Sequence, residues 1–268
     1  MRILGINALF HDPAAALVVD GRVVAAAEEE RFSRRKHGKR PVPFSAWELP
    51  EKAAGWCLER AGLRPQDLDA VAYSFDPALA LPAGRMGLDD PWDHLRLTYA
   101  REAPGFLRTA LPGLDPEAVR FVPHHMAHAA SGAFAADGAD TCSVLVLDGR
   151  GERASHLAAR RVHHRLEPLT AQDLPHSLGL VYEELTEHLG FLRSSDEFKV
   201  MALASYGGRG WRGSCAGTCT RPVTAASARQ ACPGTVCARR AARRRRGRRT
   251  TRTSPPAPRR SWRRRCWT

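Results

Sequence analysis

Two histidines four residues apart, His124 and His128, carry the clearest chemical signal in the sequence. They stand where a strand-like run, 119–122, gives way to a predicted helix, 125–136. Side chains four apart lie on one face of a helix, so these two imidazoles could bind a single metal ion. The same spacing also fits histidines that only cap a helix or cover its surface, and the pattern alone does not decide between the two.

Asp148 is the candidate for a third ligand. It follows the apolar run 143–147 and begins the turn Asp148-Gly149-Arg150-Gly151-Glu152. Glycine in such a turn lets backbone N–H groups approach a phosphate while the carboxylate faces a cation. This interpretation gives Gly149 and Gly151 a ligand-binding role, whereas a simple hairpin is the alternative.

Two other segments could contact a ligand. His11 and Asp12 stand between the first two predicted strands, and α/β folds place ligand groups in loops at the carboxyl ends of strands. A basic run follows three glutamates, and it could bind phosphate or form a solvated charged loop. Its members are Arg31, Arg34, Arg35, Lys36, His37, Lys39 and Arg40.

The elements that must position these groups alternate between strand and helix patterns. Apolar runs at 2–9 and 14–19 are followed by Asp20-Gly21, a strong hairpin signal, and by a third run at 22–28. An amphipathic helix is predicted at 50–61, with Pro50 at its start and Gly62 after its end. Further strands are predicted at 70–75, 119–122, 143–147 and 156–162, and helices at 125–136 and 178–189.

These patterns predict a mixed α/β fold whose second half, from residue 143, repeats the hairpin-forming start of the first. Residues 76–118 mix Pro, Gly, Asp and Trp in irregular order, so we expect a long insertion with some helix there.

The composition divides the chain near Gly208. Residues 1–208 hold 23 basic and 28 acidic side chains, a net charge of −5, whereas the whole chain carries +13. Their only cysteines are Cys57 and Cys142, which is typical of a reducing compartment, and no run reaches the about 18 apolar residues of a membrane helix. The start of the chain also lacks a secretory signal pattern. We therefore expect a cytoplasmic protein without a membrane partner.

Residues 209–268 do not resemble a segment selected to fold. They contain 18 arginines, no Lys, Asp or Glu, and no Leu, Ile, Phe or Met, so they cannot build an apolar core. We expect a disordered, Arg-rich tail produced by a frameshift near Gly208, because its composition resembles out-of-frame translation of GC-rich DNA. Two alternatives stay open: residues 239–265 could bind nucleic acid nonspecifically through its phosphates, and four cysteines could bind zinc. The cysteines are Cys215, Cys219, Cys232 and Cys237.

Six segments within residues 1–207 form an ordered pattern. They are LGINALFHDPAAALVVDG, AAAEEERFSRRKHG, VPHHMAHAASGAF, VLVLDGRGE, LGLVYEELTEHLG and FKVMALASYG. In order and approximate spacing they resemble the carbamoyltransferases of nodulation-factor and antibiotic biosynthesis, the NodU/CmcH type. Six segments in order are far more specific than any one of them.

The resemblance implies an actin/Hsp70/sugar-kinase-like (ribonuclease H-like) fold for an incomplete amino-terminal domain, 1–208. It also implies an enzyme that transfers a carbamoyl group to a hydroxyl of a small-molecule or sugar acceptor. The carbamoyl group comes from carbamoyl phosphate through carbamoyl adenylate, which a carboxy-terminal YrdC-like domain makes with ATP. No specific nucleic-acid partner is expected.

The resemblance also implies roles for individual residues. Carried over by motif, the ligands of iron(II) or another divalent ion would be His124, His128 and Asp148. The groups that approach the carbamoyl adenylate would be His11, Lys36 and Lys199. Lysines can neutralise phosphate charge, and a histidine can take the proton of the acceptor hydroxyl. The identity of the metal stays open, since two histidines and a carboxylate suit iron, zinc or manganese alike.

The sequence departs from the family pattern in two places. Ala202 stands where the family usually has Gly, which is a small change. The resemblance ends near Gly207, so a further carboxylate ligand and the YrdC-like domain are expected to be missing. On that basis we expect the product to be inactive or poorly folded by itself.

Overall fold

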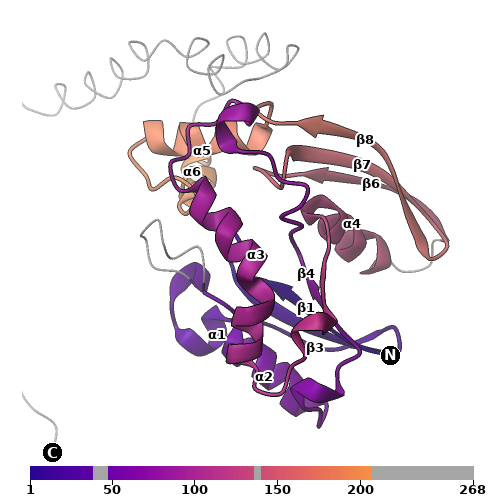
Figure 1. The fold of residues 1–268 in the computed structure, drawn as a ribbon. Helices are drawn as coiled ribbons and strands as arrows, with labels where there is room; N and C mark the ends of the chain where they lie inside the picture. Colours follow the sequence, from indigo (N-terminus) through magenta and orange to yellow (C-terminus); the bar gives the residue numbers. More distant parts are fainter. Residues whose placement is uncertain (39–47, 136–139, 207–268) are drawn as a thin grey trace, which may run out of the picture. The chain divides into compact units, whose positions relative to one another are not determined.

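The computed structural model describes residues 1–38, 48–135 and 140–206, which all fall in one structural unit. A five-stranded sheet has the order β3-β2-β1-β4-β5 (Figure 1). Its strands are β1 (Arg2–Asn7), β2 (Ala14–Val19), β3 (Arg22–Glu28), β4 (Ala70–Tyr73) and β5 (Val119–Phe121). β2 is antiparallel to both β1 and β3, whereas β1, β4 and β5 are parallel to one another.

The hairpin of β2 and β3 follows from the turn at Asp20-Gly21. Both residues have positive φ angles, 48° and 79°, as a two-residue hairpin turn of the I′ type requires. Asp and Gly adopt this conformation more readily than other residues. The predicted hairpin is therefore confirmed.

An apolar core joins the sheet to helix α2 (Glu51–Arg60), which contacts β2 and β3. The helix buries Ala53, Ala54, Cys57 and Leu58, which share one helical face as the sequence predicts. The strands contribute side chains that are at most 2% exposed. These are Leu4, Ile6, Leu17, Val71 and Tyr73.

The segment between β4 and β5 contains a helix of 18 residues, α3 (Asp93–Ala110), besides two short 3-10 turns, η4 (Ala83–Met86) and η5 (Pro116–Ala118). The expectation of an irregular insertion with some helix understated this order. Pro104 and Gly105 inside the helix obscure its pattern, although its buried side chains keep helical spacing. They are Leu97, Tyr99, Ala100, Ala103 and Leu107.

A second sheet is an antiparallel meander in the order β6-β7-β8. Its strands are β6 (Thr141–Leu147), β7 (Ala154–Val162) and β8 (Arg165–Asp173). Helix α4 (His124–Ala135) packs against β6 and β7 (Figure 1), around the buried residues Ala129, Val146, Leu157 and Ala159. Three consecutive antiparallel strands also begin the first sheet, in agreement with the predicted repeat.

Five further helical segments complete the described chain, and one of them is the 3-10 turn η3 (Pro65–Asp67). α5 (Leu178–His188) begins after Ser177, whose hydroxyl oxygen accepts the N–H of Leu180 at 3.1 Å, as an N-cap does. The others are α1 (Glu30–Ser33), the 3-10 turn η1 (Lys36–Gly38) and α6 (Glu197–Ala204). Neither β8 nor α6 was predicted from the sequence. Among the described helices, none combines the length and the apolar character needed to cross a bilayer.

Several expectations lie outside the described residues. They concern the Arg-rich tail 209–268 with its frameshift, nucleic-acid and zinc interpretations, the basic residues Lys39 and Arg40, and the predicted helix end at residue 136.

Candidate metal centre

The carboxylate of Asp148 and the imidazoles of His124 and His128 converge. Nε2 of His124 lies 3.0 Å from Oδ2 of Asp148 and 3.2 Å from Nε2 of His128. One ligand atom from each residue lies within 4.8 Å of the other two. Helix α4 puts the histidines one turn apart on the same face, and Asp148 is the first residue after β6. The structure thus brings together the three residues predicted as metal ligands.

A hydrogen bond to Ser74 determines which nitrogen of His124 faces this cluster. Nδ1 of His124 lies 3.0 Å from the carbonyl oxygen of Ser74, which can only accept, so Nδ1 carries the hydrogen. In the neutral ring, Nε2 then presents a lone pair to the carboxylate of Asp148. Such a meeting of lone pairs requires a cation, either a proton or a metal ion. The donor set therefore fits a divalent ion, and the Ser74 carbonyl fixes the tautomer that a histidine ligand needs.

Burial and neighbouring charges shift the pKa values in the cluster. Burial raises the pKa of Asp148, but the hydrogen bond with His124 and its charge lower the pKa to about 2. Burial lowers the pKa of His124, yet the hydrogen bond and charge of Asp148 bring the pKa above its ordinary value. Burial and the charge of His124 lower the pKa of His128. An ionised carboxylate therefore faces two imidazoles and attracts a cation.

His125 is a third imidazole beside Asp148. Its side chain is buried, and Nε2 lies 3.6 Å from Oδ2 of Asp148. Burial, followed by the charge of His124, lowers the pKa of His125 to about 4. His125 is therefore neutral near pH 7 and adds no positive charge to the cluster.

Hydrogen bonds and close packing hold the turn that carries Asp148. The N–H of Gly149 donates to Oδ1 of Asp148 at 2.7 Å, and the N–H of Gly151 donates to the carbonyl of Ala154 at 2.8 Å. A Cβ atom on Gly151 would lie only 2.7 Å from Cε1 of His125, so the close approach requires glycine here. Both amides have acceptors within the chain, and the phosphate-binding role expected of the two glycines stays a prediction.

His11 lies beside the cluster. Its charge contributes to the lowered pKa of His128, and its Nδ1 lies 2.8 Å from Oδ2 of Asp12. The hydrogen bond with His11 is the largest cause that lowers the pKa of Asp12 to about 2. Oδ1 of Asp12 also lies 3.1 Å from Nδ1 of His37. Asp12, Glu30 and His37 form a second group whose ligand atoms are close enough to share an ion.

Lys36 and Lys199 come together around Phe198. Nζ of Lys36 lies 3.7 Å from the centre of the Phe198 ring, and Nζ of Lys199 lies 5.7 Å from it. Lys199 also pairs with Asp196 at 2.7 Å, and the ring of His37 contacts Phe198. The two lysines predicted to approach the carbamoyl adenylate are therefore neighbours in space, although they are far apart in the sequence.

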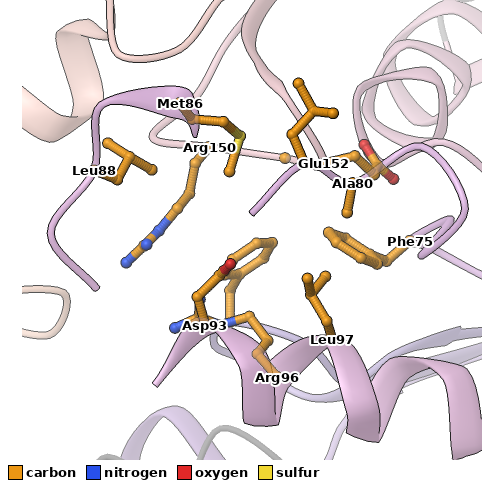
Figure 2. Close-up of a pocket in the computed structure, with 12 residues that line it drawn as sticks. Phe75, Ala80, Met86, Leu88, Asp93, Arg96, Leu97, Arg150 and Glu152 are labelled. Atoms are coloured by element: carbon orange, nitrogen blue, oxygen red, sulfur yellow. The ribbon is translucent and has the colours of Figure 1, made fainter. Parts of the chain in front are cut away.

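A pocket borders the turn after β6 (Figure 2). Arg96, from α3, and Arg150, from the turn, reach into it from opposite sides, and Nη1 of each binds Oδ2 of Asp90, at 3.0 Å and 2.7 Å. Burial raises the pKa of Asp90, but the charges of both arginines lower it below its ordinary value. Phe10 packs under both guanidinium groups and against the ring of His124. Most of the remaining wall is apolar and consists of Phe75, Ala80, Leu81, Met86, Leu88 and Leu97.

Sequence reasoning missed three residues that hold the centre. Ser74 fixes the tautomer of His124, His125 packs beside Asp148, and Glu152 accepts the backbone N–H of His124. Glu152 could have been suspected, because it is the last residue of the turn motif that Asp148 begins. Nothing in the sequence near Ser74 signals its role.

Comparison with known protein families gives a match over most of the chain. The family model described as Carbamoyltransferase N-terminus matches residues 2–78 and 99–211. The chain belongs to this family. This membership confirms the family that the sequence resemblance indicated. The match leaves out residues 79–98, which include Asp90, Arg96 and most of the apolar wall of the pocket.

Two curated relatives of this carbamoyltransferase-family chain are much longer proteins. Nodulation protein NolNO of Sinorhizobium fredii (strain NBRC 101917 / NGR234) is 37% identical over 207 residues, which cover 75% of this chain and 28% of that protein. Uncharacterized protein sll1178 of Synechocystis sp. (strain ATCC 27184 / PCC 6803 / Kazusa) is 33% identical over 232 residues, which cover 76% of this chain and 34% of that protein. The chain therefore spans only 28% and 34% of the lengths of these two relatives.

Solved structures give weaker similarities. YeaZ from Pseudomonas aeruginosa has a TM-score of 0.35 and 16% identity, over 65% of this chain and 68% of that one. A protein with similarity to peptidase YEAZ, from the same organism, has a TM-score of 0.37 and 14% identity, over 78% of this chain and 93% of that one. These values are too low to assign the fold of the carbamoyltransferase-family chain.

Proposed function

We propose that this chain is the part of an O-carbamoyltransferase that transfers the carbamoyl group to a hydroxyl of a small molecule or sugar in secondary-metabolite biosynthesis. The group would come from carbamoyl phosphate through carbamoyl adenylate, which is formed with ATP. One observation carries the proposal. In a chain of the carbamoyltransferase family, ligand atoms of His124, His128 and Asp148 lie within 4.8 Å of one another.

In this proposal His124, His128 and Asp148 hold iron(II) or another divalent cation. When bound, such a cation polarises a carbonyl or phosphoryl oxygen and stabilises developing negative charge. The chain's own contribution is to present two neutral imidazoles and one carboxylate. The hydrogen bond from His124 to Ser74 and the low pKa of Asp148 support that arrangement.

The transfer step would be attack of the acceptor hydroxyl oxygen on the carbamoyl carbon. A new C–O bond forms, the bond from that carbon to the adenylate phosphate oxygen breaks, AMP leaves, and the hydroxyl loses its proton. His11 is the candidate base, because donation from its Nδ1 to Asp12 at 2.8 Å would leave Nε2 able to accept. Lys36 and Lys199 would neutralise phosphate charge near their contact with Phe198.

The proposal extends to the fold and the compartment. The sheet order β3-β2-β1-β4-β5, with an antiparallel meander beside parallel strands, supports the actin/Hsp70/sugar-kinase-like (ribonuclease H-like) fold. The free thiols of Cys57 and Cys142 support action in a reducing compartment such as the cytoplasm. Acceptor contacts would come partly from residues 76–118, which contribute most of the pocket wall.

A chimera tests the transfer function. Residues 1–206 would replace the matching segment of a full-length family member with measurable carbamoyl transfer, and the chimera would receive carbamoyl phosphate labelled at its carbonyl carbon, ATP and a panel of sugar hydroxyl acceptors. We expect label on an acceptor together with release of AMP, and none when Asp148→Asn is introduced. A folded, metal-loaded chimera that transfers no label to any acceptor accepted by the parent enzyme would refute the proposal.

A further inference from the structure

One buried carboxylate lies behind the candidate metal centre and touches none of its ligand atoms. Glu152, 5% exposed, uses a single oxygen, Oε1, to accept two backbone N–H groups. The N–H of His124 donates at 2.7 Å and that of Asp76 at 2.8 Å. These bonds connect the turn after β6 to the first residue of α4 and to the loop after β4.

Each connected segment supplies one component of the centre. Helix α4 carries His124 and His128, the loop after β4 carries the Ser74 carbonyl that fixes the His124 tautomer, and the turn carries Asp148. Helix α4 also packs against β6 and β7, the strands on either side of the turn. Glu152 adds two hydrogen bonds to that packing, which tie the turn to the first residue of α4 and to the loop after β4.

Helix physics favours a carboxylate at this place. The first N–H groups of a helix have no partner within it, and the helix N-terminus carries partial positive charge. Glu152 satisfies the first of these groups in α4 from outside the helix. Gly151 makes the approach possible, because a Cβ there would lie 3.2 Å from Cβ of His124 as well as against His125.

We propose that Glu152 is a positioning residue for the metal centre, which holds α4, the Ser74 loop and the Asp148 turn in the spacing that binds a divalent cation. This inference rests on the metal site of the proposed function. Outer partners of metal ligands are worth about 10–100-fold in metal affinity. Glu152→Ala should therefore weaken binding of Co²⁺ by about that factor, and it should alter the visible absorption spectrum of the bound ion. Glu152→Gln keeps an acceptor oxygen at the same reach, so it should restore most of the affinity.

The test is titration of the 268-residue chain with Co²⁺ alone, followed by calorimetry and by visible absorption. Circular dichroism would first establish the folded fraction of each variant. Glu59→Ala, at an exposed position on α2, serves as the control for loss of a carboxylate. Leu17→Ala, in the core of the first sheet, serves as the control for a general loss of stability. Both controls should keep the parental affinity in their folded fraction.

Three outcomes overturn the inference. Glu152→Ala could bind Co²⁺ with parental affinity and spectrum, or Leu17→Ala could weaken binding as much as Glu152→Ala does. In either case the metal site itself survives if the parental chain binds Co²⁺ and His128→Ala does not. If the parental chain binds no Co²⁺, the metal site of the proposed function fails, and the positioning role fails with it. Glu152→Asp, which keeps the charge but is one methylene shorter, supplies a second variant if Glu152→Ala does not fold, and it should also bind more weakly than Glu152→Gln.

Discussion

The imidazole of His124 donates from Nδ1 to the carbonyl oxygen of Ser74, across 3.0 Å. Because only the ring can donate in this pair, the nitrogen that faces Asp148 is the one that gains or loses a proton. In the metal-free chain that nitrogen prefers a proton, since Asp148 raises the pKa of His124 above its ordinary value. A metal ion and a proton therefore compete for one position.

We expect metal binding to release a proton and to strengthen as pH rises. A ligating imidazole must be neutral. Below the raised pKa of His124 the cation has to displace its proton, so affinity should climb through the region above pH 6.5 and level off once pH exceeds that pKa. Calorimetric titration with Co²⁺ in two buffers of different ionisation enthalpy measures the number of protons released. An affinity that does not change between pH 6 and pH 8 would contradict the shared position.

Gly151→Ala should disturb the centre, whereas Gly55→Ala should not. A Cβ on Gly151 would meet His125 at 2.7 Å and His124 at 3.2 Å, which is overpacking worth about 1–3 kcal/mol of the free energy of unfolding. Gly55 lies inside α2 with nothing within 4 Å of its Cβ position. Alanine there should therefore raise the free energy of unfolding by about 0.5–1 kcal/mol. Urea denaturation of both variants provides the measurement. Equal effects at the two sites would show that the turn accommodates a side chain.

Asp90→Asn should destabilise the chain by about 3 kcal/mol, near the lower end for removal of one partner of a buried ion pair. Arg96 and Arg150 would lose the negative charge that both bind, and their side chains are only 12% and 19% exposed. Asp173→Asn is the matched control. It breaks an exposed pair with Arg153, and such pairs contribute less than about 1 kcal/mol. Urea denaturation of the two variants distinguishes these expectations, and a loss of stability in Asp90→Asn no larger than that of the control would contradict the prediction.

His11→Gln should lower turnover in the active chimera while leaving Co²⁺ affinity close to parental. His11 contacts Asp12 and lies outside the three ligands, so its loss removes a base and no metal ligand. General bases typically contribute about 10²–10⁴-fold to rate. Steady-state transfer of labelled carbamoyl groups measures the loss. Normal turnover in the His11→Gln chimera removes His11 from the role of base.

Local patterns predicted much of the fold. The Asp20-Gly21 turn and the apolar face of α2 follow from neighbouring residues, and both appear in the structure. β8 was missed because most of its side chains are exposed and it contains Pro168, so neither alternation nor composition identified it. Its pairing with β7 determines its conformation, and this is tertiary information.

In the candidate site, too, the sequence predicted the residues marked by their neighbours in the chain and missed those that depend on tertiary contacts. His124 and His128 are one turn apart, and Asp148 ends an apolar run, so each could be selected from its neighbours in the chain. Ser74 lies 50 residues from His124, and its backbone carbonyl carries no mark in the sequence. Glu152 was visible within a motif, but its contacts with two amides depend on three segments meeting in space.

The Arg150–Asp90 pair joins a turn inside the family pattern to a segment, 79–98, that the family pattern does not include. A different segment at this place that lacked a carboxylate would leave Arg150, in the turn of the candidate metal centre, without this counter-ion. A successful graft would need to bring its own carboxylate at the position of Asp90. Exchange of this segment between relatives is thus limited by charge.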